Sequence, residues 1–231
     1  MQKTVLVVGG TSGLGECLAD RFESELGYRV VVAGRTMRRA ERPFCWVNFG
    51  SCTRPLVEHV ESVLGLHGLD RGIDCFIYAA GVPEDGRIDE LSDEHEQEQF
   101  DTGLRAPHMF LSRIMKRQGK LDGLITIGST SEQTARLREP LYCMVKSGLV
   151  GYARSLALDE RFGRIVHAAV AGMKTTFLER LGRDTTEMLD PDWVAGKILE
   201  EWSAPAFKHS HMLFARKPAP DAKVTELKWP A

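Results

Sequence analysis

Tyr142 and Lys146 stand four positions apart in the run Tyr-Cys-Met-Val-Lys, and Ser129 precedes the tyrosine by 13 positions. On a helix, residues at i and i+4 share a face, so a lysine ammonium there would favour phenolate and lower the tyrosine pKa from its reference of about 10. A phenol tuned in this way can give or take the proton of an alcohol or carbonyl group. Because the Tyr-x-x-x-Lys spacing also arises by chance on amphipathic helices, its meaning depends on the rest of the chain.

A glycine-rich turn near the start of the chain supplies a second motif, Gly9-Gly10-Thr11-Ser12-Gly13-Leu14-Gly15. It follows the apolar run 4–8 and opens a helical pattern over 13–26. Gly9 allows a tight turn, while Gly13 and Gly15 let the backbone approach a pyrophosphate and let the helix pack on the strand. The N–H groups of the helix start would then face the phosphates. We expect a dinucleotide to bind here.

The end of the next apolar run bears on which dinucleotide that is. Folds of this kind that prefer NAD place an acidic residue about 20 positions on, where it binds the adenine ribose diol. Here the stretch reads Ala33-Gly34-Arg35-Thr36. Nothing in it repels a 2′-phosphate, and the Arg35 guanidinium can fork onto one. The stretch favours NADP(H); a solvated basic turn is the alternative.

Short apolar runs alternate with longer helical patterns along the chain. We expect strands at 4–8, 29–34, 44–49, 73–79, 124–128, 164–170 and 211–215, and helices at 13–26, 53–64, 100–117, 141–162 and 192–202. This order predicts one α/β Rossmann domain over residues 1–231, with a doubly wound parallel sheet of about seven strands flanked by helices. Residues 217–231, which contain three prolines, are expected to form an extended tail.

Composition narrows the class of protein. The chain has 231 residues, of which 43% are hydrophobic, and a net charge of −2. This charge gives no electrostatic reason to expect nucleic acid or an anionic membrane as a partner. The apolar runs are strand-sized, and Met1-Gln2-Lys3-Thr4 leads directly into the first of them, so neither a membrane span nor a signal peptide is expected.

The cysteines and histidines point to no metal site. The five cysteines are odd in number and lack metal-type spacing, which favours reduced thiols in a cytoplasmic protein. No recognisable set of metal ligands is formed by five of the histidines, which are His95, His108, His167, His209 and His211. We expect His209-Ser-His211 to lie at the surface of an edge strand.

Together these motifs resemble the classical short-chain dehydrogenase/reductase family over residues 4–202. The run Ile125-Thr126-Ile127-Gly128-Ser129 is similar to the ketoacyl-reductase branch. The resemblance implies hydride transfer between NADP(H) and a small-molecule carbonyl or alcohol. Tyr142 would be the general acid/base and Ser129 would orient the carbonyl oxygen. Lys146 would bind the nicotinamide ribose and lower the tyrosine pKa.

The resemblance also implies further cofactor contacts. Tyr78-Ala79-Ala80-Gly81 matches the second half of the family's Asn-Asn-Ala-Gly motif, beside the adenine ribose. Asn48, next to Phe49, falls where the family has an aspartate that reaches the adenine amino group. Gly172 and Thr176 fall on the segment that flanks the nicotinamide, with Ala171 in place of its usual proline.

Gly103 stands where the family has an asparagine that holds a water in the proton relay to the lysine. Pro107, four residues later, has no N–H to donate and crowds the carbonyl of Gly103. A carbonyl freed in this way could hold the relay water without a side chain. The alternative is a local kink without catalytic meaning.

Substrate contacts are less defined. Residues 177–190 form a candidate lid, and the candidates for the pocket wall are Thr134, Leu137, Leu141, Phe177 and Leu178. The family's common dimer would pair the helices at 100–117 and 141–162 with their symmetry copies, so we expect a homodimer or homotetramer. The run Phe214-Ala-Arg-Lys217 replaces the family's usual glycine pair, which weakens the inference to a tetramer.

Two other function classes stay open. The same fold could act as an isomerase or dehydratase, for which a tightly retained cofactor would be the sign. The protein could also be a dinucleotide-binding regulator with a decayed active site, as Gly103, Tyr78 and Ala171 suggest. The intact Ser129–Tyr142–Lys146 set argues against the regulator.

Overall fold

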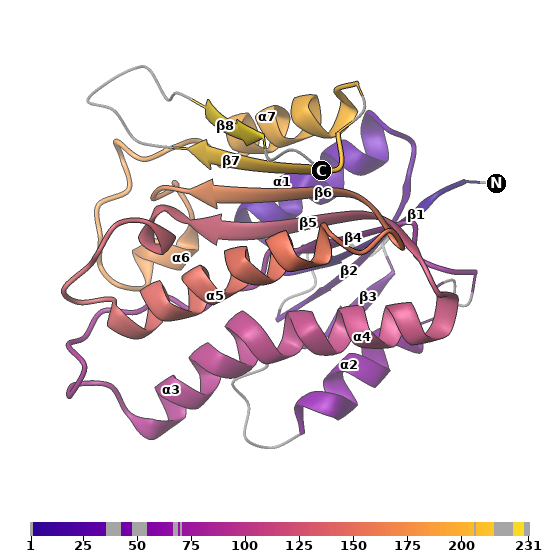
Figure 1. Ribbon diagram of the computed structural model, residues 1–231. Helices are drawn as coiled ribbons and strands as arrows, with labels where there is room; N and C mark the ends of the chain where they lie inside the picture. Colours follow the sequence, from indigo (N-terminus) through magenta and orange to yellow (C-terminus); the bar gives the residue numbers. More distant parts are fainter. Residues whose placement is uncertain are drawn as a thin grey trace.

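A parallel sheet forms the centre of the molecule (Figure 1). The computed structural model describes residues 2–35, 43–47, 55–66, 69, 71–205, 207–214 and 224–228. Within these residues the strand order is β3-β2-β1-β4-β5-β6-β7-β8. Strands β1 to β7 pair in parallel, and β8 pairs with β7 in the antiparallel sense. Their bounds are β1 (Thr4–Val8), β2 (Arg29–Gly34), β3 (Phe44–Trp46), β4 (Cys75–Tyr78), β5 (Leu121–Ser129), β6 (Phe162–Val170), β7 (His209–Phe214) and β8 (Val224–Lys228).

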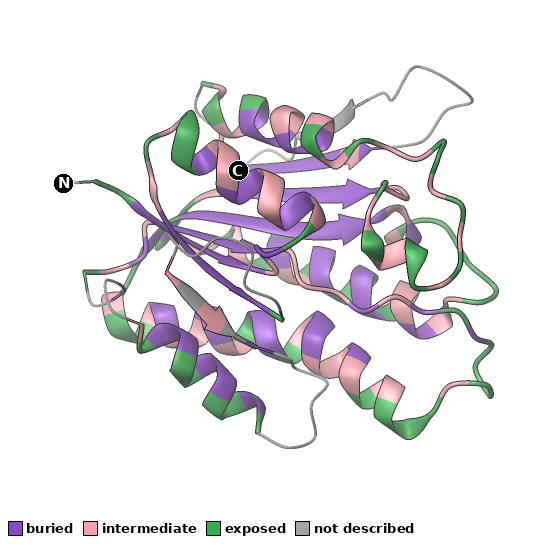
Figure 2. Ribbon diagram, turned by 180° about the vertical axis from the view of Figure 1, so that it is seen from behind, coloured by how far each residue is buried: buried purple, intermediate pink, exposed green. Residues whose placement is uncertain are grey.

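Helices cover both faces of this sheet. On one face lie α1 (Gly13–Ser24) and α7 (Pro191–Ser203), and on the other α2 (Leu56–Leu64), α4 (Ala106–Gln118) and α5 (Pro140–Leu156). The central strands are purple along their length in Figure 2, because both faces are buried. The unbroken apolar runs of the sequence follow from this double covering. The predicted α/β Rossmann fold is confirmed.

Two helix predictions need correction. The helix expected at 100–117 is the end of a longer rod made of α3 (Asp93–Phe100), a π-helical turn η1 (Asp101–Arg105) and α4. The π-turn lies just before Pro107, whose missing N–H breaks the α-helical hydrogen-bond ladder there. The helix expected to run to 162 ends at Leu156, because the chain turns and enters β6 at Phe162.

The strand order determines where a site can form. The chain runs from β1 outward to β2 and β3, and then returns to β4 on the other side of β1. In open α/β sheets, ligands bind beyond the carboxyl ends of the strands at such a reversal. Gly9 follows β1 and Ala79 follows β4 at this place.

None of the helices in the described ranges is long and apolar enough to cross a lipid bilayer. In the C-terminal segment, β8 adds an antiparallel edge strand that the sequence pattern did not predict.

Candidate active site

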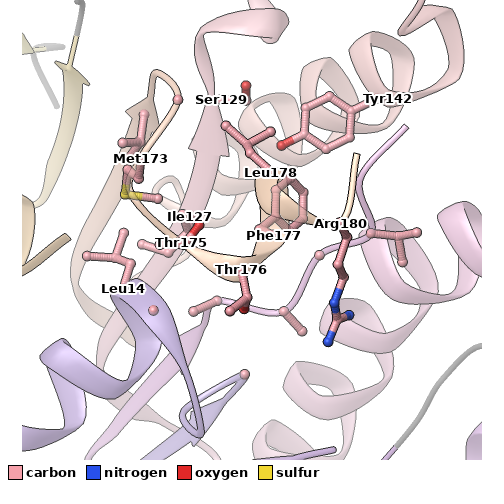
Figure 3. A pocket seen from close by; sticks show the side chains of 18 of the residues that line it. Leu14, Ile127, Ser129, Tyr142, Met173, Thr175, Thr176, Phe177, Leu178 and Arg180 are labelled. Atoms are coloured by element: carbon pink, nitrogen blue, oxygen red, sulfur yellow. The ribbon is translucent and has the colours of Figure 1, made fainter. Parts of the chain in front are cut away.

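A pocket of about 670 Å³ opens at the carboxyl ends of the central strands (Figure 3). Its wall combines the glycine-rich turn, the ends of β4, β5 and β6, the start of α5, and the short helix α6 (Thr176–Glu179). Most of the residues predicted for the site line this one pocket: Gly9, Thr11, Ser12, Gly13, Leu14, Gly15, Gly34, Arg35, Ala79, Ala80, Gly81, Ser129, Tyr142, Lys146, Gly172 and Thr176. Thr36, Asn48 and Phe49 lie outside the described residues.

The glycine-rich turn is packed too tightly for side chains. Gly9 has a φ of +85°, and a Cβ there would lie 2.5 Å from the backbone N of Ala80. A Cβ on Gly15 would lie 2.2 Å from the carbonyl oxygen of Gly9. The start of α1 is thereby held against the ends of β1 and β4.

The same turn fits a pyrophosphate. Ser12 is the N-cap of α1, and its side chain makes no capping hydrogen bond to the described residues. The first N–H groups of α1 therefore lie beside the pocket without a cap from this serine, as an anion-binding helix start requires. Gly13, with a φ of +55°, lines the pocket at the same place.

Two arginines line this pocket near the end of β2. Arg35 follows β2, and Arg180 comes directly after α6. Burial and the neighbouring Arg180 charge both lower the pKa of Arg35, although Glu98 opposes them. Two like charges held beside one pocket favour an anionic ligand between them.

Ser129, Tyr142 and Lys146 meet at the other end of the pocket. Ser129 ends β5, and its hydroxyl hydrogen bonds to the Tyr142 phenol and accepts from the N–H of Ser131 at 3.1 Å. Lys146 lies one turn along α5, with Nζ 5.4 Å from the centroid of the Tyr142 ring. Its ammonium donates to the carbonyl of Ile127 at 2.9 Å. Figure 3 shows the Tyr142 ring turned into the pocket, near Phe177.

The prediction that Lys146 lowers the pKa of Tyr142 is wrong. Burial raises the pKa of Tyr142 above its ordinary value, and the Ser129 hydrogen bond opposes this only in part. Burial also lowers the pKa of Lys146 to about 8, against the charge of Glu132. The reason is that both groups lie away from water, where the charged form of each is disfavoured.

Gly103 lies behind the site and does not line the pocket. A Cβ there would lie 2.0 Å from Cγ1 of Val145, so Val145 fills the space that a side chain would need. Next to it, the Tyr78 hydroxyl donates to the carbonyl of Thr102 in η1. This contact explains the tyrosine in place of the expected asparagine. The relay role of the Gly103 carbonyl stays a prediction.

The lid region reaches the proposed catalytic group. The ring of Phe177, on α6, lies 6.3 Å from that of Tyr142, centroid to centroid. Leu178 also lines the pocket. Thr134, Leu137 and Leu141, which the sequence also suggested, do not; Leu137 is exposed and Leu141 is buried in the core.

Sequence reasoning missed two buried carboxylates beside the site, Glu84 and Glu132. Glu84 accepts hydrogen bonds from the N–H groups of Leu141 and Tyr142 at 3.1 and 2.9 Å. Glu132 accepts from two histidines, His167 at 2.8 Å and His211 at 2.7 Å. Glu132 is the third residue after Ser129, and that spacing of a capping box was the available signal.

The histidine interpretation is therefore wrong in part. His209 and His211 are buried in β7, which is not the edge strand because β8 pairs beyond it, and His211 contacts Glu132 and Arg154 on one face of the sheet. His167 and His211 also stand opposite each other in the β6–β7 register, so they share one face.

Comparison with known proteins agrees with this geometry. No family model matches the chain. It is 28% identical over 207 residues to the 3-oxoacyl-[acyl-carrier-protein] reductase of Haemophilus influenzae, covering 84% of this chain and 80% of the relative.

Solved structures show the same fold. A short-chain dehydrogenase/reductase family protein aligns with a TM-score of 0.76 at 20% identity, covering 91% of this chain and 94% of the other. The alcohol dehydrogenase of Thermococcus sibiricus, complexed with 5-hydroxy-NADP, gives 0.77 at 17% identity and covers 92% and 96%. The glycine-rich turn, the Ser–Tyr–Lys group and these relatives all agree with a resemblance to the short-chain dehydrogenase/reductases, and the sequence is similar to that of ketoacyl reductases.

Proposed function

We propose that the protein is an NADP(H)-dependent oxidoreductase that interconverts a small-molecule carbonyl and its alcohol. The observation that carries this proposal is the meeting of Ser129, Tyr142 and Lys146 in the pocket that the glycine-rich turn also lines. A solvated serine, an exposed helix lysine and a core tyrosine would not be gathered in this way. Here Lys146 is 5% exposed and Ser129 is 7% exposed, and both still border the cavity.

The chain's own groups account for the proton chemistry. When bound, the reduced nicotinamide supplies hydride to the carbonyl carbon. Tyr142 gives its proton to the carbonyl oxygen as negative charge develops there, and the Ser129 hydroxyl donates to the same oxygen. Because burial raises its pKa, Tyr142 holds this proton at neutral pH, which suits a donor in the reductive direction. Lys146 would bind the ribose hydroxyls at the base of the site.

The cofactor preference follows from the charges at the other end. The turn Gly9–Gly15 and the start of α1 would hold the pyrophosphate. Arg35, with Arg180 near it, would hold the 2′-phosphate that distinguishes NADP(H) from NAD(H). Gly81, Gly172 and Thr176 would border the nicotinamide half. These assignments are proposals that rest on the pocket lining and the charge pattern.

A 3-oxoacyl thioester is the first substrate to test, because the relative described above is a 3-oxoacyl-[acyl-carrier-protein] reductase. Phe177 and Leu178 supply apolar wall for an acyl chain, while Arg136 and Arg183 supply positive charge. We also propose a homodimer or homotetramer and a cytoplasmic location.

The test is NADPH oxidation by the purified protein with 3-oxoacyl thioesters, simple ketones and aldehydes, followed at 340 nm. Tyr142→Phe removes only the donated proton and leaves the glycine-rich turn intact. We expect turnover to fall by about 10²–10⁴-fold while NADPH affinity changes little. Near-normal turnover of the phenylalanine variant would contradict the proposal. A cofactor that stays bound and is regenerated in each turnover would point to the isomerase or dehydratase alternative.

A further inference from the structure

A row of polar side chains crosses three neighbouring strands behind the proposed catalytic group. Thr126 of β5 stands opposite His167 of β6, which stands opposite His211 of β7. All three are buried in the sheet. The Thr126 hydroxyl and Nδ1 of His167 lie 2.7 Å apart.

Glu132 joins this row to the loop that carries Ser129. Its carboxylate is fully buried, with Oε2 2.8 Å from Nε2 of His167 and Oε1 2.7 Å from Nε2 of His211. Oε2 also accepts from the backbone N–H of Ser129 at 3.5 Å. The carbonyl of Glu132 accepts from the hydroxyl of Ser147, the neighbour of Lys146 on α5, at 3.2 Å. Glu132 therefore touches both elements that carry the Ser–Tyr–Lys group.

The glycine at position 128 leaves space for the contact between Glu132 and His167. A Cβ on Gly128, which directly precedes Ser129, would lie 2.3 Å from Nε2 of His167 and 2.5 Å from Oε2 of Glu132. A glycine is therefore required where the His167–Glu132 pair meets β5. The His167–Glu132 pair therefore packs directly against the end of β5, which carries Ser129.

We propose that Glu132, clamped between His167 and His211, is a positioning residue that fixes Ser129 and keeps a permanent negative charge near Lys146 and Tyr142. The inference rests on the proposed function, because those residues are its target.

The protonation states follow from the partners. Burial opposes ionisation of Glu132, but the hydrogen bonds from His167 and His211 outweigh it and hold the pKa at about 2. Arg154 of α5 donates to Nδ1 of His211 at 3.4 Å, so the proton of that ring is on Nε2, facing Glu132. A protonated Nε2 donates a hydrogen bond and cannot bind a metal ion. This favours a hydrogen-bonded carboxylate over a metal centre in the Glu132–His167–His211 group.

The charge of Glu132 acts on both proposed catalytic groups. It raises the pKa of Lys146 against burial, and it also raises the pKa of Tyr142. The other titratable or charged groups that face this region are His167, His209 and His211 on the sheet, Glu139 at the start of α5, and Cys143 and Arg154 on α5. Removing the Glu132 charge should therefore lower the pKa of both Lys146 and Tyr142.

Glu132→Gln removes the charge and keeps a hydrogen-bonding group beside both histidines, whereas the amide NH2 in place of Oε2 no longer accepts from the N–H of Ser129. The amide oxygen can accept from Nε2–H of His211, and the amide N–H can donate to Nε2 of His167 if that ring moves its proton to Nδ1. Thr126 permits this second tautomer, because a hydroxyl accepts as well as donates. We expect Glu132→Gln to fold. Glu132→Ala removes charge and contact together.

The readout is the ionisation of Lys146, followed by the ¹³Cε shift of labelled lysine and assigned with Lys146→Arg. We expect the midpoint, near pH 8 in the unmodified protein, to fall by roughly half a unit to one unit in Glu132→Gln. Glu201→Gln is the control, because Glu201 is a buried carboxylate on α7, on the other face of the sheet. The Lys146 midpoint should not move in Glu201→Gln.

Turnover gives the second readout. Both Glu132 variants should lower kcat with little change in NADPH affinity, Glu132→Ala more than Glu132→Gln, and the pH profile of Glu132→Gln should shift to lower pH. An unchanged Lys146 midpoint in folded Glu132→Gln overturns the inference, as does a stoichiometric metal ion in the unmodified protein that both variants lose. Failure of the proposed function is distinct: the unmodified protein would reduce no carbonyl, whatever the Lys146 midpoint does.

Discussion

The backbone N–H of Tyr142 donates to Oε2 of Glu84 at 2.9 Å, so a buried carboxylate caps the helix that carries the proposed acid. The other carboxylate oxygen of Glu84, Oε1, accepts from the backbone N–H of Leu141, so a second N–H in the first turn of α5 has a hydrogen-bond acceptor. A carboxylate is also favoured at a helix N-terminus by the helix dipole. Glu84 thus holds the Tyr142 backbone from a loop 58 residues earlier.

Glu84→Ala should loosen Tyr142 without touching the pocket turn. Two buried N–H groups lose their acceptor, which costs about 1–3 kcal/mol of unfolding free energy by denaturant titration. We expect kcat to fall and the NADPH dissociation constant to stay nearly constant. Glu90→Ala is the matched control, since Glu90 is an exposed carboxylate of the same loop region. Equal stability of the Glu84 and Glu90 variants would show that the cap contributes nothing.

The features that the sequence predicted correctly depend on residues that are close together in the chain. Apolar runs predicted the seven parallel strands, and the glycine spacing predicted the turn between β1 and α1, because both features depend on residues close in the chain. The Tyr–Lys spacing on one helix face and Ser129 at a strand end were readable for the same reason.

The parts that escaped prediction depend on pairs that are distant in the chain. The Glu132–His211 contact spans 79 residues and needs the β6–β7 register, which a one-residue slip would destroy. The fit of Gly103 to Val145 depends on how η1 meets α5. The raised pKa of Tyr142 depends on burial, which spacing along a helix does not report.

Arg35 should decide cofactor choice. In Arg35→Ala the 2′-phosphate loses a charge-assisted partner, so NADPH affinity should fall roughly ten- to hundredfold while NADH affinity changes little. Fluorescence titration of both cofactors measures this. Arg180→Ala should weaken NADPH binding as well, because its charge faces the same region. Arg87→Ala, at an exposed arginine away from the pocket, should have no effect. Equal affinities for NADPH and NADH in the unmodified protein would contradict this assignment.

Gly103 and Val145 should be energetically coupled. Gly103→Ala places a methyl group 2.0 Å from Cγ1 of Val145, and such overpacking typically costs about 1–3 kcal/mol. In Val145→Ala the nearest atom would be Cβ, at an ordinary 3.4 Å. The double variant should therefore be more stable than the sum of the two single changes predicts, by about 1 kcal/mol or more in a double-mutant cycle. Simple additivity would mean that the two residues do not compete for this space.

The proposed assembly can be tested at Gly151. This residue is exposed on α5, and a Cβ there would meet no described atom within 4 Å. Gly151→Arg should therefore leave the fold of one protomer intact and block close approach of α5 to its symmetry copy. Light scattering should show a dimer or larger for the unmodified protein and a smaller species for the variant. A monomeric unmodified protein would remove the proposed assembly.

Acid should destabilise the protein in two steps, of which His209 supplies the first. Burial lowers the pKa of His209 from 6.5 to about 4, and His167, His211 and Arg154 add to this. Because the folded pKa lies below the unfolded one, the stabilisation is present above about pH 6.5 and is lost as pH falls to about 4. The lowering corresponds to up to about 3 kcal/mol of unfolding free energy.

His209→Phe removes this titration and keeps an aromatic side chain in β7. Its unfolding free energy, measured by denaturant titration from pH 8 to 4, should vary less than that of the unmodified protein. Below about pH 4.5 both proteins should lose stability together. The Glu132 carboxyl has a pKa of about 2 in the folded protein, so it takes up its proton at higher pH in the unfolded chain, and this favours unfolding. His108→Phe, which replaces an exposed imidazole on α4, is the control. If His209→Phe loses as much stability between pH 6.5 and 4 as the unmodified protein does, the acid sensitivity arises elsewhere.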